Sequence, residues 1–409
     1  MDEAYPSARY RKAIYMEKHQ ISDQYRPAVF WSFNDRLEKE KLKNQLSSLR
    51  EAGLMGGFMH SRVGLVTEYM SDEWLDQLSF CCKTAKEWHT HLWLYDEDRW
   101  PSGYGGGAVL RENSDLKGKA LCLIPEGRAG ELAVRKPIKQ VSHEGKRYTI
   151  AVCELKTGNP WYGGGCYVDL LNPDATDTFL KTTHEKYKKR LGQYFGKELK
   201  GVFSDEFCYS QKAAYPVFNL PFTDGLEEKF LESKGYSLTD VIEKLFFDLD
   251  GYETLRFDFY DLLTRLFIES YTKRYQNWCH ANNLLLTGHL MNEDTLTGQT
   301  EWVGAVMPHY AAMDMPGIDK LGLAKDQAVT VKQVSSAAEQ LGRRCLCEAF
   351  GCIGHQSGPK AIKGLSDWLN ALGISFINPH LSLYSMRGER KRDYPPNISP
   401  LQPWFENAK

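Results

Sequence analysis

Two segments that carry carboxyl groups are the first features of the sequence that could perform chemistry. The run LKGVFSDEF places Ser204, Asp205 and Glu206 after apolar residues, and RRCLCEAF places Glu348 in a similar setting. Cleavage of a glycosidic bond requires one carboxyl group that protonates the departing oxygen and a second that attacks the anomeric carbon or activates water. Glu206 and Glu348 are therefore the candidate catalytic pair, provided that the fold brings them to one site.

The elements that would bring these glutamates together are repeated βα units. Short apolar runs alternate with longer segments of helical period, which is typical of parallel strands joined by helices. The runs predict strands at residues 28–33, 54–60, 91–98, 199–207, 284–290, 309–315, 343–350 and 374–380. This order favours an α/β protein with a closed (β/α)8 barrel, the TIM barrel, over an open doubly wound sheet. Active sites of such barrels lie at the C-terminal ends of the strands, where both glutamates fall.

The regular alternation is interrupted after the third predicted strand. The runs ALCLIPEG, YTIAVCEL and GGCYVDL alternate like antiparallel strands, so we predict a small β-rich insertion over residues 108–172. Residues 1–27 are expected to form an N-terminal extension, and residues 28–409 the catalytic barrel. The glycine-rich stretch from Gly103 to Gly107 lacks the pattern of a nucleotide-binding turn.

Polar and aromatic residues at or just after the other strand ends predict a mouth that binds a sugar. Aromatic faces cover the C–H surface of a sugar ring, whereas carboxylates, amides and imidazoles bind its hydroxyl groups. For any single candidate, a structural role fits the sequence about as well as contact with the ligand, because buried polar side chains are generally hydrogen-bonded within the fold. The candidate substrate-binding residues are Trp31, Asn34, Asp35, His60, Arg62, Tyr95, Asp96, Asp98, Arg99, Trp100, Asp205, His289, Glu293, Asp314 and His380.

Composition excludes several other classes of function. The 409 residues include 51 Lys and Arg against 53 Asp and Glu, and no basic run is interleaved with aromatic residues, so a nucleic-acid partner is not expected. No segment approaches the roughly 20 apolar residues of a membrane span, and the first residues do not resemble a signal peptide. We therefore expect no membrane partner and a cytoplasmic location, with the ten cysteines as free thiols. Cys345, Cys347 and Cys352 lack the C-x-x-C spacing of zinc sites.

Two alternatives stay open at this point. A metal-dependent hydrolase on the same barrel is suggested by polar residues near strand ends, although the metal and its ligands are unassigned; these are His60, His289, His309, Asp314 and His380. The H-x-H pair His89 and His91 precedes the third predicted strand and would lie on the face opposite the mouth. A carbohydrate-binding barrel without catalytic activity is the second alternative, since barrels host many unrelated functions.

The quoted segments also carry a resemblance to a known family. AVFWSFNDRLEKEKLKNQLSSLREAGLMGGFMHSRVGLVTEYMSDEW and HLWLYDEDRWPSGYGGG, with SDEF, CEAFG and NISPLQPW further on, resemble the catalytic barrel of α-L-rhamnosidase-like proteins grouped around glycoside hydrolase family 106. The likeness extends from about residue 26 onward. It implies hydrolysis of a glycoside by an acid and a base on the fourth and seventh strands, which correspond to Glu206 and Glu348.

The resemblance has further implications for cofactors and architecture. It implies inversion at the anomeric carbon and a calcium ion near the sugar, with no other cofactor required, and it implies β-sandwich domains after the barrel. The placement of the glutamates also resembles a large retaining clan in which an Asn precedes the acid, whereas Asp205 stands at that position here. Rhamnose specificity and stereochemistry therefore stay open on the sequence.

Overall fold

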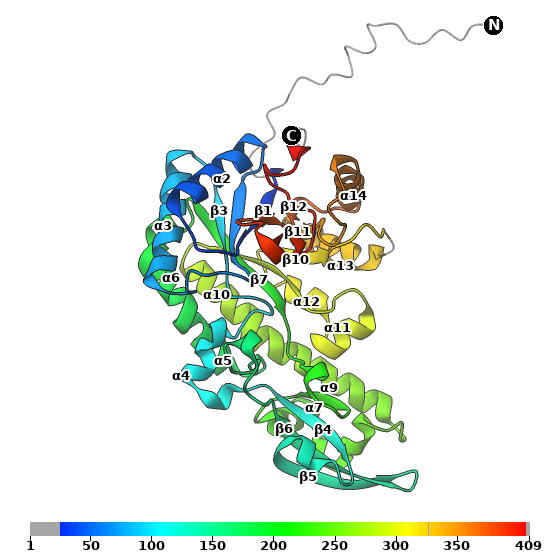
Figure 1. The fold of residues 1–409 in the computed structure, drawn as a ribbon. Helices are drawn as coiled ribbons and strands as arrows, with labels where there is room; N and C mark the ends of the chain where they lie inside the picture. Colours follow the sequence, from blue (N-terminus) through cyan, green and yellow to red (C-terminus); the bar gives the residue numbers. More distant parts are fainter. Residues whose placement is uncertain (1–24, 326, 406–409) are drawn as a thin grey trace, which may run out of the picture.

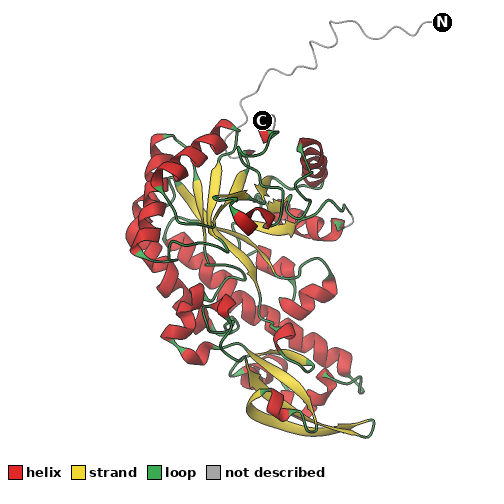
Figure 2. Ribbon diagram, in the orientation of Figure 1, coloured by secondary structure: helices red, strands yellow, loops and turns green. Residues whose placement is uncertain are grey.

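Parallel strands wrap into a barrel with helices around its outside (Figures 1 and 2). The computed structural model describes residues 25–325 and 327–405, so residues 1–24 of the expected extension lie outside the described residues. The spatial order of the nine strands is β12-β11-β10-β9-β7-β3-β2-β1-β13, which confirms the predicted (β/α)8 barrel with one short added strand. Their bounds are β1 (Ala28–Phe33), β2 (Gly56–Ser61), β3 (Leu92–Tyr95), β7 (Leu199–Phe207), β9 (Leu285–Leu290), β10 (Met315–Lys320), β11 (Leu346–Ala349), β12 (Phe376–Pro379) and β13 (Ser382–Leu383).

The last and first strands close the ring. The Asn378 Nδ2 group of β12 donates a hydrogen bond to the Ala28 carbonyl oxygen of β1 at 2.7 Å. The chain then enters β13, where Ser382 pairs with Trp31 in parallel register. Because this contact covers both outer strands, the sheet presents no long unpaired edge between β12 and β1.

Strand alternation divides the apolar residues between the barrel interior and the surrounding shell. In β1, Phe30 packs inside, where its ring centroid lies 4.8 Å from that of Phe203, while Val29 and Trp31 belong to the outer core. Successive strand side chains point to opposite faces, so each run supplies both layers. The interior is filled mainly by Phe30, Phe58, Trp93, Tyr95, Phe203, Met315, Leu346 and Phe376.

The outer helices follow the periodicity of the sequence. In α2, Leu42, Leu46 and Leu49 share the buried face, and in α3 the Ser71 hydroxyl accepts a hydrogen bond from the Trp74 amide, which caps the first turn. Among the described residues, no helix is long and apolar enough to cross a membrane. Helix bounds around the barrel are α2 (Lys39–Glu51), α3 (Asp72–Glu87), α6 (Glu185–Leu191), α9 (Tyr252–Phe267), α10 (Lys273–Ala281), α11 (Leu296–Trp302), α12 (Val306–Tyr310), α13 (Ala328–Gln340) and α14 (Pro359–Ala371).

A separate antiparallel sheet extends from one end of the barrel (Figure 1). Its order is β5-β6-β4-β8, with β4 (Lys119–Pro125), β5 (Ala133–His143) and β6 (Lys146–Glu154) from the segment that follows β3, and β8 (Asn219–Phe222) from the segment after β7. Residues 164–170 do not form the expected strand, and only Val168 makes an isolated bridge, to Lys117. The connecting helices are α4 (Ala108–Glu112), α5 (Pro173–Phe179), α7 (Leu226–Lys234) and α8 (Leu238–Val241).

The sixth barrel strand differs from its predicted position. Residues 306–310 form α12, and the strand runs over Met315–Lys320 instead of residues 309–315. A short apolar run does not distinguish a strand from a helical turn by periodicity alone, which explains the shift. The new bounds change which aspartate lies at the mouth. Asp314 precedes the strand and lies at its N-terminal end, whereas Asp319 lies near its C-terminal end, at the mouth.

The glycine-rich stretch after β3 surrounds a carboxylate. Glu97 accepts hydrogen bonds from the backbone amides of Gly103, Tyr104, Gly105 and Gly106 at 2.6–3.1 Å. Gly105 and Gly106 both adopt positive φ, which residues with a Cβ rarely tolerate. The glycines therefore fold the loop around Glu97, consistent with the sequence analysis that found no nucleotide-binding turn.

Candidate active site

Strand register brings carboxylates to one end of the barrel. Asp319 of β10 pairs with Glu348 of β11, and Glu348 pairs in turn with Asn378 of β12. Residues in register on neighbouring strands point to the same face, so these three side chains form a row at the C-terminal ends of their strands. Asp319 was not among the residues selected from the sequence, because the sixth strand was placed too early.

A β-bulge presents two adjacent residues of β7 to the same site. Ser204 pairs with Gly288 and Phe207 with Leu290, so three steps along β7 oppose two steps along β9. The extra residue falls at Asp205 and Glu206, and Glu206 adopts a positive φ of 48°. Bulges re-aim side chains in this way and are common beside active sites. A Cβ at Gly288 would collide with the Ser204 carbonyl oxygen, so the adjacent position requires glycine.

His289, at the end of β9, lies among these carboxylates. Its Nε2 atom is 2.8 Å from Asp205 Oδ1 and 3.3 Å from Glu348 Oε2, and its Nδ1 atom is 3.5 Å from Glu293 Oε1. Burial opposes protonation of the ring, but the carboxylates Asp205 and Glu348 outweigh it and raise the pKa of His289 well above its ordinary value. The imidazolium is therefore the charge that partly neutralises a group of acids.

The two predicted catalytic glutamates have different surroundings. Glu348 is 5% exposed, and burial raises its pKa to about 7 while the nearby His289 opposes the shift. Glu206 is more exposed, and burial together with Asp205 raises its pKa to about 8. Carboxyl groups with pKa values raised into the neutral range are typical of acid–base sites, where one group must be protonated and the other ionised.

A cavity of about 580 Å³ opens beside the carboxylates, over β9 and β10. Its walls include Glu206, His289 and Glu293 from the sequence-based list. They also include Trp302 and Lys320, which the sequence analysis missed. Trp302 ends α11, a helix inside the β9–β10 connection that the predicted strand pattern did not contain. The one signal in the sequence was that Trp302 is an aromatic residue in the segment that connects the fifth and sixth strands.

The opposite side of the mouth is made by β1 to β3 and by the segment after β13. Arg62 makes a two-pronged ion pair with Asp393, both contacts at 2.8 Å, and its guanidinium lies 4.3 Å from the centroid of the Trp100 ring. The rings of His60 and Tyr95 are in contact, with 3.7 Å between centroids and a tilt of 40° between their planes. The Tyr95 hydroxyl donates to Asp205 at 2.6 Å, which joins this side to the acidic cluster.

Two further candidates lie close to this group. His380 Nε2 is 3.6 Å from Glu348 Oε1, and burial and Arg62 hold the pKa of His380 well below its ordinary value. Asp98 accepts from Ser61 at 2.9 Å and pairs with Arg99, whose guanidinium lies over Trp161. The structure thus brings His60, Arg62, Tyr95, Trp100, Asp205, His289, Glu293 and His380 together with Glu206 and Glu348, with Asp98 and Arg99 beside Trp100.

Three selected residues do not reach the mouth. Trp31 points outward from β1, and its Nε1 donates to Gln45 of α2 at 2.9 Å, because the alternation of β1 directs Phe30 inward. Asp96 lies behind the sheet, where it accepts from Ser102 and Tyr275. Asp314 accepts from His280 and from the Leu286 amide at the opposite end of the barrel. These positions indicate structural roles.

Asn34 and Asp35 tie the end of β1 to the C-terminal segment. The Asn34 side chain exchanges two hydrogen bonds with the backbone of Ser385, at 2.8 and 2.9 Å. Asp35 pairs with Arg387 at 2.6 Å, and although burial opposes ionisation, this contact and the Arg36 amide hold the pKa of Asp35 well below its ordinary value. Both side chains are occupied by structural contacts.

The arrangement contains one grouping with the spacing of a metal site. Among the described residues, ligand atoms of Asp205, His289 and Glu348 lie within 4.8 Å of one another. His309 is not part of it, since it is buried in α12 and bonded to Thr272. Calcium takes six to eight oxygen ligands, whereas this group places an imidazole between two carboxylates. The trio does not fit the calcium ion implied by the family resemblance.

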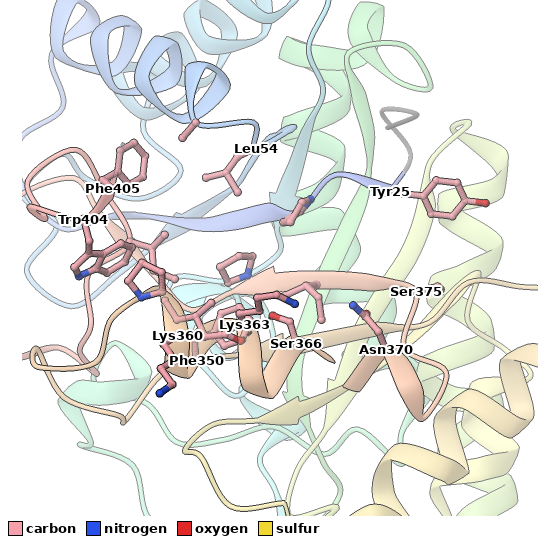
Figure 3. Close-up of a pocket in the computed structure, with 17 residues that line it drawn as sticks. Tyr25, Leu54, Phe350, Lys360, Lys363, Ser366, Asn370, Ser375, Trp404 and Phe405 are labelled. Carbon is pink, nitrogen blue, oxygen red and sulfur yellow. Dashed lines mark hydrogen bonds between the residues drawn. The ribbon is translucent and has the colours of Figure 1, made fainter. Parts of the chain in front are cut away.

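A larger cavity, of about 670 Å³, lies away from these groups on the outside of the barrel (Figure 3). It runs between α14, the outer face of β12 and the C-terminal segment, and its walls include Leu54, Ile377, Trp404 and Phe405. Lys360 and Lys363 are its only charged lining residues within the described chain. The acidic groups therefore lie at the mouth and not in the outer cavity, although the outer cavity is larger.

Comparison with solved structures agrees with the barrel fold. The chain resembles a rhamnosidase from Novosphingobium sp. PP1Y with a TM-score of 0.68 and 13% identity, over 95% of this chain and 58% of that one. The chain shares its fold with glycoside hydrolases. It also resembles the catalytic domain of a β-amylase from Paenibacillus polymyxa, with a TM-score of 0.51, 10% identity and coverage of 94% and 100%. An endo-1,4-β-mannanase from Rhizomucor miehei gives a TM-score of 0.51 at 8% identity, with coverage of 93% and 92%.

These likenesses concern the fold alone, because all three identities are low. The chain spans less than two thirds of the length of the rhamnosidase that it resembles. No family model and no curated protein matches the sequence. The function is therefore argued from the site.

Proposed function

We propose that this protein hydrolyses a glycosidic bond with Glu206 as general acid and Glu348 as general base. The observation that carries the proposal is the pair itself: two carboxyl groups at the ends of β7 and β11, with pKa values raised to about 8 and about 7, beside an open cavity. Burial raises both pKa values, so at neutral pH one carboxyl group of the pair can hold a proton while the other is ionised. This matches the division of roles that glycoside hydrolysis needs.

The chemical steps follow from these two roles. Glu206 gives its proton to the glycosidic oxygen as the bond to the anomeric carbon breaks. Glu348 takes a proton from a water molecule that attacks that carbon from the opposite face, so the product has inverted configuration. Asp205, Glu293 and Asp319 accept hydrogen bonds from sugar hydroxyls. The His289 imidazolium favours the ionised form of Glu348.

We propose α-L-rhamnosides as the first substrates to test. Support comes from the sequence resemblance around Glu206 and Glu348 and from the rhamnosidase with a similar barrel. A panel of 4-nitrophenyl glycosides and plant oligosaccharides would identify the sugar, and NMR of the first-formed anomer would establish the stereochemistry. Release of the retained anomer would overturn inversion and assign Glu348 as a nucleophile.

A second candidate function rests on the Asp205, His289 and Glu348 grouping, which could hold a transition metal in a metal-dependent hydrolase. Elemental analysis of the purified protein distinguishes the two. A stoichiometric transition metal, lost together with activity on chelation and restored by adding it back, would favour the metal-dependent enzyme. Full activity in the presence of chelator supports the carboxyl pair.

A further inference from the structure

We infer that the cavity over β9 and β10 is the subsite for the leaving group and that it accepts a neutral sugar, with Trp302 as its platform. The inference rests on the proposed function. The role of Glu206 as acid does not specify the leaving group, and the cavity does.

The position of the cavity relative to the two glutamates gives the first argument. Glu206 is part of its wall, whereas Glu348 is not among its described lining residues. A general acid must lie beside the oxygen of the leaving group, and the base acts on the other face of the sugar that is attacked. The cavity on the Glu206 side is therefore where the leaving group lies.

The chemistry of the walls defines the occupant. Trp302 is partly exposed to the cavity and offers an apolar face, while Asn292, Asp294 and Lys320 supply hydrogen-bonding groups. An aromatic face with a few polar groups suits a sugar ring. Glu206, Glu293, Asp294 and Asp319 face His289 and Lys320 across this wall, and burial raises the pKa values of Glu206, Glu293 and Asp319. The wall therefore carries little net charge at neutral pH, which favours a neutral leaving group. The volume of about 580 Å³ lies within the usual range of ligand pockets, about 300–1,000 Å³.

The segment that follows Glu206 holds Trp302 in place. The Tyr209 amide donates to the Trp302 carbonyl oxygen at 3.1 Å, and the Tyr209 hydroxyl donates to the Thr300 carbonyl oxygen at 2.7 Å. Lys212 in the same segment forms an ion pair with Glu301 at 2.5 Å. Three contacts thus fix α11 to the segment immediately after the proposed acid. They hold Trp302 at a fixed position relative to Glu206.

The test compares leaving groups that share one glycone. Wild type and Trp302→Ala are assayed on α-L-rhamnosyl fluoride, 4-nitrophenyl α-L-rhamnoside and an α-L-rhamnosyl-glucose disaccharide. Fluoride leaves without occupying a subsite, so turnover of the fluoride reports folding and the glycone side. We expect the ratio of kcat/KM on the disaccharide to kcat/KM on the fluoride to fall about 10- to 100-fold in Trp302→Ala, as for loss of a contact made to one part of the substrate.

Trp368→Ala is the matched control, because Trp368 is also partly buried but lies on α14, away from the mouth. It should keep that ratio within about twofold of wild type. If Trp302→Ala does not fold, Trp302→Leu replaces it. An equal loss on all three substrates would overturn the subsite, and a loss confined to the nitrophenyl glycoside would overturn the neutral-sugar assignment. Lack of turnover of any glycosyl fluoride by wild type would overturn the proposed function, and the subsite with it.

Discussion

The two sides of the barrel mouth differ in how their charged residues are paired. On the side of β1 to β3, Arg62 is paired with Asp393 and Asp35 with Arg387. On the side of β7 to β11, the carboxyl groups of Asp205, Glu293 and Glu348 share the imidazole of His289, and Glu293 Oε2 is buried without a hydrogen-bond partner in the described chain. Charges that are paired one to one hold a fold together, while buried acids that outnumber their cationic partner have raised pKa values that suit proton transfer. The comparison separates the structural half of the mouth from its chemical half.

The largest expected effect comes from removing a proton-transfer group on the chemical side. Glu206→Gln should lower kcat by about 10²–10⁴, the usual contribution of a general acid. The loss should be smaller for substrates whose leaving group needs little protonation, such as a glycosyl fluoride. Steady-state kinetics across leaving groups measures this. An equal loss on every leaving group would contradict the role of Glu206 as acid.

Glu348→Gln should lower kcat by a similar factor of about 10²–10⁴, because Glu348 is the proposed acceptor of the proton from water. The replacement keeps the shape of the side chain and removes a buried charge that Asp205 disfavours. The thermal midpoint should therefore not fall. Activity that declines only in proportion to the folded fraction would make Glu348 a structural residue.

On the structural side, Arg62→Met should cost stability. The change leaves Asp393 without its partner, and breaking a buried pair costs about 3–5 kcal/mol. We expect the lower end, about 3 kcal/mol, because the Asp393 side chain is 19% exposed. Denaturant unfolding measures the change. The double variant Arg62→Met with Asp393→Asn should be less destabilised than the sum of the single variants, and additive losses would contradict the importance of the pair.

The pH dependence should report both glutamates. Glu348 must be ionised, so activity should be lost as pH falls through about 7, and Glu206 must be protonated, so activity should be lost as pH rises through about 8. His289→Gln removes the positive charge that lowers the pKa of Glu348. The acidic limb of kcat/KM should therefore move to higher pH, and the basic limb should move in the same direction because His289 also lowers the pKa of Glu206. An unmoved acidic limb would show that His289 does not act on Glu348.

The sequence was sufficient for the barrel and for the position of Glu206 and Glu348 at strand ends, because both depend on local patterns. The apolar run before Glu348 defines a buried strand, and the alternation along it directs Leu346 and Glu348 to one face. The missed features depend on long-range contacts. The residue inserted at Glu206 appears only in the pairing of β7 with β9, and Trp302 enters the site because Tyr209 fixes α11. Trp31 was misplaced for a local reason, since the alternation from Phe30 was not applied to it.

The smallest expected effect on activity concerns the two aspartates of one strand. Asp314→Asn should leave kcat/KM within about twofold of wild type and lower stability by about 1 kcal/mol, the usual net contribution of a hydrogen bond, because the Asp314 side chain is only partly buried. Its carboxylate accepts from His280 at 2.7 Å and from the Leu286 amide at 2.8 Å, far from the mouth. Asp319→Asn at the other end of β10 changes the same chemical group. It should lower kcat/KM about tenfold, because Asp319 faces the cavity beside Glu348.

The pair of variants isolates position along the strand, since both replace a carboxylate with an amide of nearly the same shape. Each is measured for unfolding in denaturant and for turnover of the best glycoside. If Asp314→Asn reduces activity as much as Asp319→Asn at equal folded fraction, then the two ends of β10 are not functionally distinct. Such a result would contradict the assignment of the active site to the C-terminal ends of the strands, on which the role of Glu206 and Glu348 depends.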